Sequence, residues 1–205
     1  MTLFGCLLII IFLIAYEKRK NSKLSEEESR KFWEKESMAN LTPSKDLSGL
    51  NYIDISFSTL PFDPNASGEF LAVQKELELL KDRKFVNLTG YTNTDLKLTY
   101  GRANLDLLSS YDQNFTLLTR GLHKWGTLLY EAERLSEAQT VFETSIACGT
   151  DVSKTYTTLA ELYVKTEKTE KIKSLIDSAQ TIHTVIKEAT IKELERISAS
   201  CYFLS

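Results

Sequence analysis

The side chains that most often carry catalysis or bind metals are few and widely spaced in this 205-residue chain. Its two histidines, His123 and His183, lie far apart, as do the three cysteines, Cys6, Cys148 and Cys201. No zinc-type His or Cys spacing, serine-hydrolase elbow or glycine-rich phosphate loop occurs in the sequence. We therefore predict no catalytic residue, no metal site and no cofactor, and we do not expect an enzyme.

The composition favours a helical protein and argues against some classes of function. With only 8 glycines and 3 prolines, the chain lacks the turn signals of a β-sandwich or β-barrel. Lys and Arg number 25 against 28 Asp and Glu, a formal net charge of -3. This near-neutral balance argues against a nucleic-acid binder. The predicted fold class is all-α.

An uncharged apolar run, LFGCLLIIIFLIAY, occupies residues 3–16. About 16 residues at about 1.5 Å each span roughly 24 Å, against a bilayer core of about 30 Å. The cations Lys18, Arg19 and Lys20 follow and can snorkel toward the lipid headgroups. We predict a single-pass signal anchor at 1–16 in the cell membrane, and the positive-inside rule places the C-terminal domain in the cytoplasm. A cleaved signal peptide and a buried N-terminal helix remain alternatives.

Charged residues dominate 17–39, with seven Lys or Arg and six Asp or Glu. Ser25 and Glu28 have the spacing of a helix N-cap with a capping box, and Glu27 and Lys31 that of a helical ion pair. We predict an exposed helical stalk here.

Residues 40–67 contain all three prolines. Ile53, Ile55 and Phe57 alternate with polar residues, a strand-like period, yet no second strand candidate exists to pair with them. We predict an extended segment that lies across the helical domain. The alternative is that it pairs with a second copy of the chain.

From 68 to 205 the apolar residues follow helical spacing, which predicts a helical domain. Phe70, Val73, Leu77 and Leu80 mark one helix. A second is expected from Leu96 to Leu108, and these two helices would form an antiparallel pair.

Between residues 119 and 186 the pattern of large and small side chains repeats after 34 residues. Small residues match at Gly126 and Ala160, where two helices must approach closely. Ser145 matches Ala179. The other matches join Leu122, Trp125, Leu129, Ala138 and Phe142 to Tyr156, Leu159, Tyr163, Ile172 and Ile176, in that order.

This period and pattern resemble the tetratricopeptide repeat. The resemblance implies stacked antiparallel helix pairs at 119–152 and 153–186, although Gly149 and Thr150 stand where the family usually has a proline. Two repeats are too few for independent stability, so helices within 68–111 would have to cover the first pair. A capping helix at 187–200, with Val185, Ile191, Leu194 and Ile197 on its apolar side, would cover the second. The whole chain also resembles uncharacterised membrane-anchored repeat proteins of bacteria.

The resemblance also implies a binding site, because the family binds peptides or proteins on the concave face formed by the first helix of each pair. Nine residues take these positions here: Arg120, His123, Thr127, Tyr130, Lys154, Thr157, Thr158, Glu161 and Lys165. We therefore predict a membrane-anchored scaffold that holds a peptide or protein partner of unknown identity. The alternative is a structural or assembly protein that self-associates as a homo-oligomer and has no separate ligand.

Overall fold

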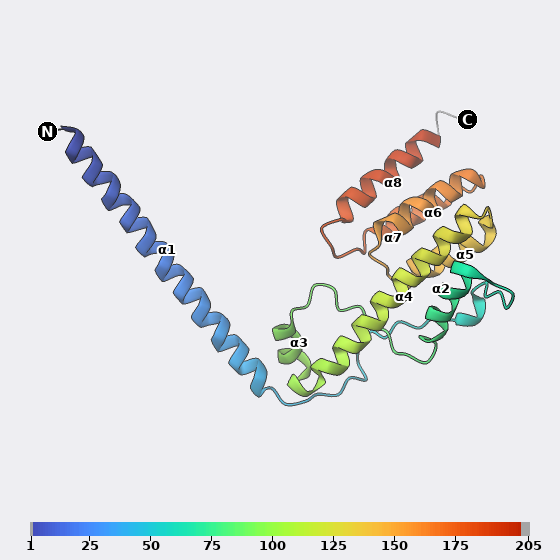
Figure 1. The fold of residues 1–205 in the computed structure, drawn as a ribbon, viewed down its shortest axis with the longest axis horizontal. Helices are drawn as coiled ribbons and strands as arrows, with labels where there is room; N and C mark the ends of the chain where they lie inside the picture. Colours follow the sequence, from blue (N-terminus) through green and yellow to red (C-terminus); the bar gives the residue numbers. More distant parts are fainter. Residues whose placement is uncertain (1, 202–205) are drawn as a thin grey trace. The chain divides into compact units, whose positions relative to one another are not determined.

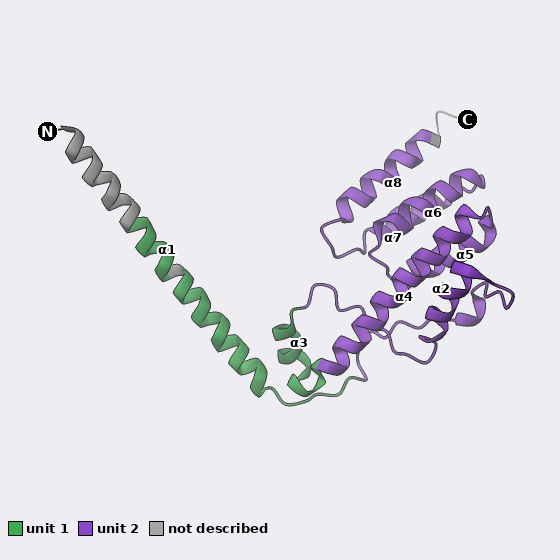
Figure 2. Cartoon of the chain, in the orientation of Figure 1, with its two compact units in different colours: residues 1–47, 92–105 green, residues 48–91, 106–205 purple. Residues whose placement is uncertain are grey.

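The computed structural model describes residues 2–201, and for residues 2–15, 24 and 201 it describes the backbone alone. The described chain is all-helical, as predicted, and contains no β-strand. It forms two compact units, residues 1–47 with 92–105 and residues 48–91 with 106–205 (Figure 2). The α-helices, drawn in Figure 1, are α1 (Thr2–Leu41), α2 (Gly68–Glu78), α3 (Asn93–Tyr100), α4 (Leu105–Glu131), α5 (Leu135–Ala147), α6 (Ser153–Lys165), α7 (Lys171–Ala179) and α8 (Lys187–Cys201).

The first helix, α1, continues without a break through the expected stalk, and its described side chains from Tyr16 to Lys35 are exposed. Ser25 lies inside this helix, so its prediction as an N-cap is wrong. The expected pair of Glu27 and Lys31 forms, with 2.8 Å between carboxylate and ammonium. The predicted anchor at 1–16 lies almost entirely outside the residues whose side chains are described. Within the described residues, no helix is both long enough and apolar enough to cross a membrane.

In the first unit, α3 docks on the last turns of α1 through charged hydrogen bonds around buried Ala39 and Leu96. Lys35 donates to Asp95 at 2.7 Å. Glu36 pairs with Lys97 and accepts from Thr94. The hydrogen bond from Lys35 and those from Thr92, the N-cap of α3, lower the pKa of Asp95 to about 2.

The helix predicted across Leu96–Leu108 is broken at Gly101, whose φ is 90°. A Cβ at this position would collide with the Pro43 backbone, so only glycine fits there. A new helix, α4, begins at Leu105. Because α2 and α3 belong to different units, the antiparallel pair expected from them does not form within either unit.

In the second unit, the predicted extended segment lies on the helical core. Ile53 and Ile55 pack against the core and Phe57 is buried, while the residues between them are exposed. The Ile53 amide donates to the Phe85 carbonyl at 3.0 Å. The Phe62 ring packs at a tilt against Trp125 of α4, with 4.9 Å between centroids. The segment therefore covers one side of α4.

The α2 helix also packs against α4, because a Cβ on Gly121 would come within 2.8 Å of the Leu77 side chain. Together, α2 and the extended segment supply the N-terminal neighbour expected of the first helix pair. No helix begins at residue 119, since α4 is continuous from Leu105.

The two predicted helix pairs lie in the second half of this unit. The α5 helix turns back along α4, so that Gly126 meets the Phe142 ring, and α7 follows α6 after a short connection. All matched core positions are buried except Ile176, which is half-buried against the core. The 34-residue pattern therefore identified the interior of these helices correctly.

The backbone repeats the same 34-residue interval at the turn inside each pair. Glu133 and Glu167 are the only non-glycine residues with positive φ in the described chain, at 58° and 57°. The Arg134 amide donates to the Leu129 carbonyl at 2.9 Å, and the Lys168 amide donates to Tyr163 at 2.8 Å. These are the six-residue bonds of a Schellman C-cap. The two turns are thus structural copies of each other.

The predicted capping helix is present as α8, which packs on α6 and α7. Leu194 and Ile197 are buried and Ile191 is half-buried, whereas Lys192, Glu195 and Arg196 face solvent. Val185 is 96% exposed and precedes the helix, so its place on the apolar side is a wrong prediction. The polar outer face lets α8 end the stack of helices.

Candidate protein-binding surface

The nine predicted binding residues come from α4 and α6, and they differ widely in exposure. Arg120, Lys154, Glu161 and Lys165 are exposed, and His123, Thr127 and Tyr130 are half-buried. Thr157 and Thr158 are only 8% and 5% exposed, which leaves little of either side chain for a ligand. The accessible part of the α4–α6 face consists of the seven other residues.

His123 lies at the contact between α4 and α6. Its Nδ1 is 3.0 Å from the Thr155 hydroxyl of α6, and its carbonyl accepts from the Thr127 hydroxyl at 2.9 Å. Burial, and then the positive charge of Lys154, lowers the pKa of His123 below its usual value of 6.5. The neutral ring is therefore part of the packing between α4 and α6, and also contributes to the surface.

Tyr130 and Lys165 meet at the far end of the same face. The Lys165 ammonium donates to both carboxylate oxygens of Glu133 at 2.7 and 2.8 Å, and it lies 5.5 Å from the centre of the Tyr130 ring. The bonds to Glu133 raise the pKa of Lys165. This cation is held within the chain and is less available to a ligand than Arg120 or Lys154.

On its other side, α6 is flanked by α8. The Thr190 hydroxyl donates to the Ser153 hydroxyl at 2.8 Å. Glu193 attracts Lys154 and is bound by Arg196 at 2.6 Å, while Glu161 attracts Arg196. The α8 helix therefore forms one edge of the exposed α4–α6 face.

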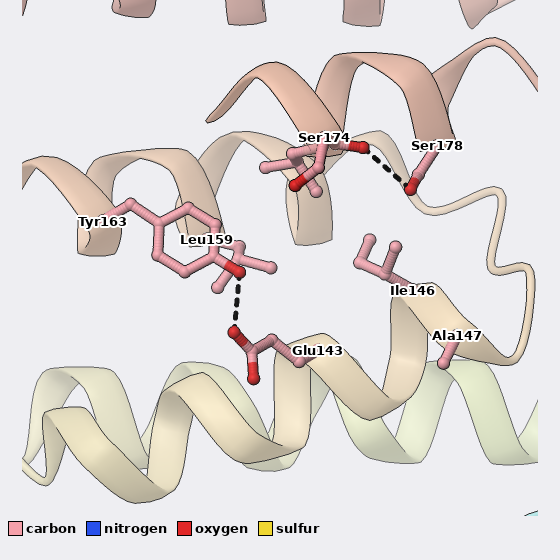
Figure 3. A pocket seen from close by; sticks show the side chains of 8 residues that line it. Glu143, Ile146, Ala147, Leu159, Tyr163, Ser174 and Ser178 are labelled. Carbon is pink, nitrogen blue, oxygen red and sulfur yellow. Dashed lines mark hydrogen bonds between the residues drawn. The ribbon is translucent and has the colours of Figure 1, made fainter. Parts of the chain in front are cut away.

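A groove of about 210 Å³, which the sequence analysis did not predict, lies between α5 and α7 (Figure 3). Leu159 and Tyr163 of α6 form its floor, and Ile146, Ala147, Ser174, Leu175 and Ser178 are among the residues that line it. The groove is shallow and open. Its apolar floor belongs to the core of the second helix pair.

At one end of this groove, Glu143 holds three helices together. Its Oε1 accepts hydrogen bonds from the Tyr163 hydroxyl at 2.8 Å, from Lys171 at 2.9 Å and from Gln139 at 2.8 Å. Burial opposes ionisation, but these bonds outweigh it and lower the pKa of Glu143. The spacing identified Tyr163 as core, but no periodic signal marks Glu143, whose partners come from the previous turn of α5 and from two other helices.

Groups that could perform chemistry remain separate in the structure. Among the described residues, no three His, Cys, Asp or Glu side chains gather in a metal-binding cluster. Burial raises the pKa of the Cys148 thiol to about 11, which disfavours the reactive thiolate. His183 is exposed in the connection before α8.

Comparisons with protein-family models, with curated proteins and with solved structures found no match to this chain. What the chain does must therefore be argued from its own residues.

Proposed function

We propose that this chain is a membrane-anchored scaffold of the tetratricopeptide type, which binds a peptide or protein on the exposed face of α4 and α6. The observation that carries the proposal is the 34-residue recurrence of the turns at Glu133 and Glu167. Side-chain pattern and backbone geometry repeat with the same interval, which is the length of a tetratricopeptide unit. The start of α8 at Lys187, one further interval after Ser153, also supports it.

Two features of the α4–α6 face support binding. It belongs to the first helix of each pair, and stacked helix pairs use such surfaces to hold extended partners. Arg120, Lys154 and Glu161 are exposed on it, and no described residue lies within ion-pair distance of their charged ends. A partner can therefore reach these charges without first breaking an ion pair.

A site-specific crosslinking experiment tests this function. A photoreactive amino acid replaces Arg120 or Glu161 in the full-length chain in cells, and the matched control carries it at Lys173, an exposed residue of α7. We expect a discrete crosslinked partner from the first two positions and none from Lys173. Equal crosslinking at all three positions would contradict a binding face on α4 and α6.

The same experiment separates the scaffold from the self-associating alternative. A crosslinked product with twice the mass of the chain, matched by a dimer that survives dilution, would favour self-association. Pairing of the extended segment with a second copy of the chain is disfavoured, because Phe57 is buried and Ile53 and Ile55 pack on the chain's own core.

The membrane anchor and its orientation are also part of the proposal, and they rest on the apolar run at 3–16 and the three cations that follow it. A reporter fused after Ser205 measures the orientation. We expect activity only from a reporter that works in the cytoplasm, whereas activity only outside would overturn it and favour a secreted domain.

A further inference from the structure

One stripe of α4 carries positive charge with no carboxylate of the same helix within one turn of it. From Gln113 to Tyr130 the helix contains no Asp or Glu, while Arg120 and Lys124 are both exposed. Leu117, three residues before Arg120, is 58% exposed. Residues spaced by three and four positions lie on one face of a helix, so these three side chains form a continuous strip. We call Leu117, Arg120 and Lys124 the α4 stripe.

Some cations elsewhere in the chain are paired with a carboxylate about one turn away. Lys31 and Arg196 each bind a carboxylate one turn away on the same helix, at 2.8 and 2.6 Å, and Arg134, just before α5, binds Glu137 at 2.5 Å. Arg120 and Lys124 instead sit one turn from each other, an arrangement that is mildly destabilising by itself. Neither has a hydrogen-bond or ion-pair partner among the described residues.

Lys154 of α6 extends the positive charge across the helix junction. It lies near His123, which is hydrogen-bonded to the neighbouring Thr155. Lys154 attracts Glu193 of α8, whose carboxylate is already bound by Arg196. Arg120, Lys124 and Leu117 thus lie on the exposed side of α4, and Lys154 lies beyond His123 at the start of α6.

We infer that the α4 stripe, together with Lys154, binds an acidic protein segment in which carboxylates flank an apolar side chain. This inference rests on the proposed function and names the class of partner. Carboxylates would remove the repulsion between Arg120 and Lys124, and an arginine can bind a carboxylate with two hydrogen bonds. The apolar side chain would cover Leu117. A nucleic acid fits less well, since the chain is acidic overall and the stripe has no aromatic ring for base stacking.

The inference is tested with the full-length chain in mild detergent and a short fluorescent peptide in which pairs of Glu alternate with single Leu residues. Two matched peptides carry Gln or Lys in place of every Glu. We expect the acidic peptide to bind, to weaken steeply with salt, and to bind at least about tenfold more tightly than either matched peptide.

Charge reversal locates the site. We expect Arg120→Glu with Lys154→Glu to weaken binding of the acidic peptide by about tenfold or more. The control, Lys173→Glu with Lys192→Glu, changes the net charge equally on exposed residues of α7 and α8 and should leave binding within about twofold. Equal weakening by both double variants, or tighter binding of a single-stranded RNA oligomer than of the peptide, would overturn the inference.

The outcome also separates this inference from the proposed function. If crosslinking from Arg120 and Glu161 yields a partner but the peptide fails to bind, the face binds proteins through other chemistry and the acidic-segment inference is wrong. If neither experiment detects binding, both are wrong. Equal melting temperatures of the two double variants would show that the comparison reports binding and not unfolding.

Discussion

Gly126 of α4 lies directly beneath the ring of Phe142 on α5, and a Cβ at this glycine would be 2.5 Å from the ring atom Cε1. Both residues are buried, so neither has free space into which it can move. We predict that Gly126→Val destabilises the chain by about 2–3 kcal/mol through overpacking. Thermal or urea unfolding of the full chain measures the loss.

The matched control for this substitution is Gly49→Val. A Cβ at Gly49 has no neighbour within 4 Å, and its φ is not positive. We expect no loss of stability there beyond about 0.5 kcal/mol. Combining Gly126→Val with Phe142→Leu should recover part of the loss, because the smaller side chain leaves room for the added methyl groups.

The two tryptophans of the chain provide a second test. Trp125 is fully buried against Phe62, whereas Trp33 on α1 is 64% exposed. We predict that Trp125→Ala costs about 3–5 kcal/mol of unfolding free energy, as expected for a buried large-to-small change. Trp33→Ala should cost less than about 0.5 kcal/mol. An unchanged melting temperature for Trp125→Ala would count against the 34-residue alignment.

A pH dependence is expected from His123. Burial and Lys154 lower its pKa below 6.5, so the unfolded chain takes up a proton at a higher pH than the folded chain does. Neutral His123 therefore contributes to the unfolding free energy above about pH 6.5, and this contribution is lost as the pH falls below that value. We predict that the melting temperature decreases from about pH 7.5 to about pH 5.5, which calorimetry at several pH values can measure.

The chain's other histidine is the control for this effect. His183 is exposed, and His183→Gln should retain the decrease. His123→Gln should flatten the profile in the same range, because the replacement cannot be protonated there. Identical slopes for the two variants would mean that the dependence comes from some other group.

The parts of the fold that could be read from the sequence are those in which a local pattern repeats. The interval of 34 residues correctly located the start of α6 at Ser153, and the apolar spacing of 187–200 correctly predicted α8. The 34-residue interval also identified Gly126 and Ala160 as buried positions where two helices approach closely. The spacing of large and small side chains is a property of each helix alone, so it can be recognised without knowing which helices pack together.

Features that depend on contacts distant in the sequence could not be predicted. Gly101 ends α3 because the Pro43 backbone lies against it, and no spacing rule relates these two residues. Phe62 of the extended segment contacts Trp125. The alternation of Ile53 and Ile55 predicts that the segment is extended, but it does not predict this contact. Among the residues predicted to bind a partner, Thr157 and Thr158 are buried by packing that their sequence position did not indicate.

One polar link between the two helix pairs joins Glu143 of α5 to Tyr163 of α6, and it can be measured by a double-mutant cycle. Tyr163→Phe removes one of the three donors to Oε1, and Glu143→Gln removes the charge that they stabilise. We predict that each substitution costs about 0.5–1.5 kcal/mol, at the low end because Glu143 is partly exposed. The coupling between the two should be about 0.5–1 kcal/mol.

The control is Glu188→Gln, an exposed change on α8, whose effect combined with Tyr163→Phe should instead be additive. Additive behaviour of the Glu143 and Tyr163 pair would mean that this hydrogen bond does not stabilise the contact between the helix pairs.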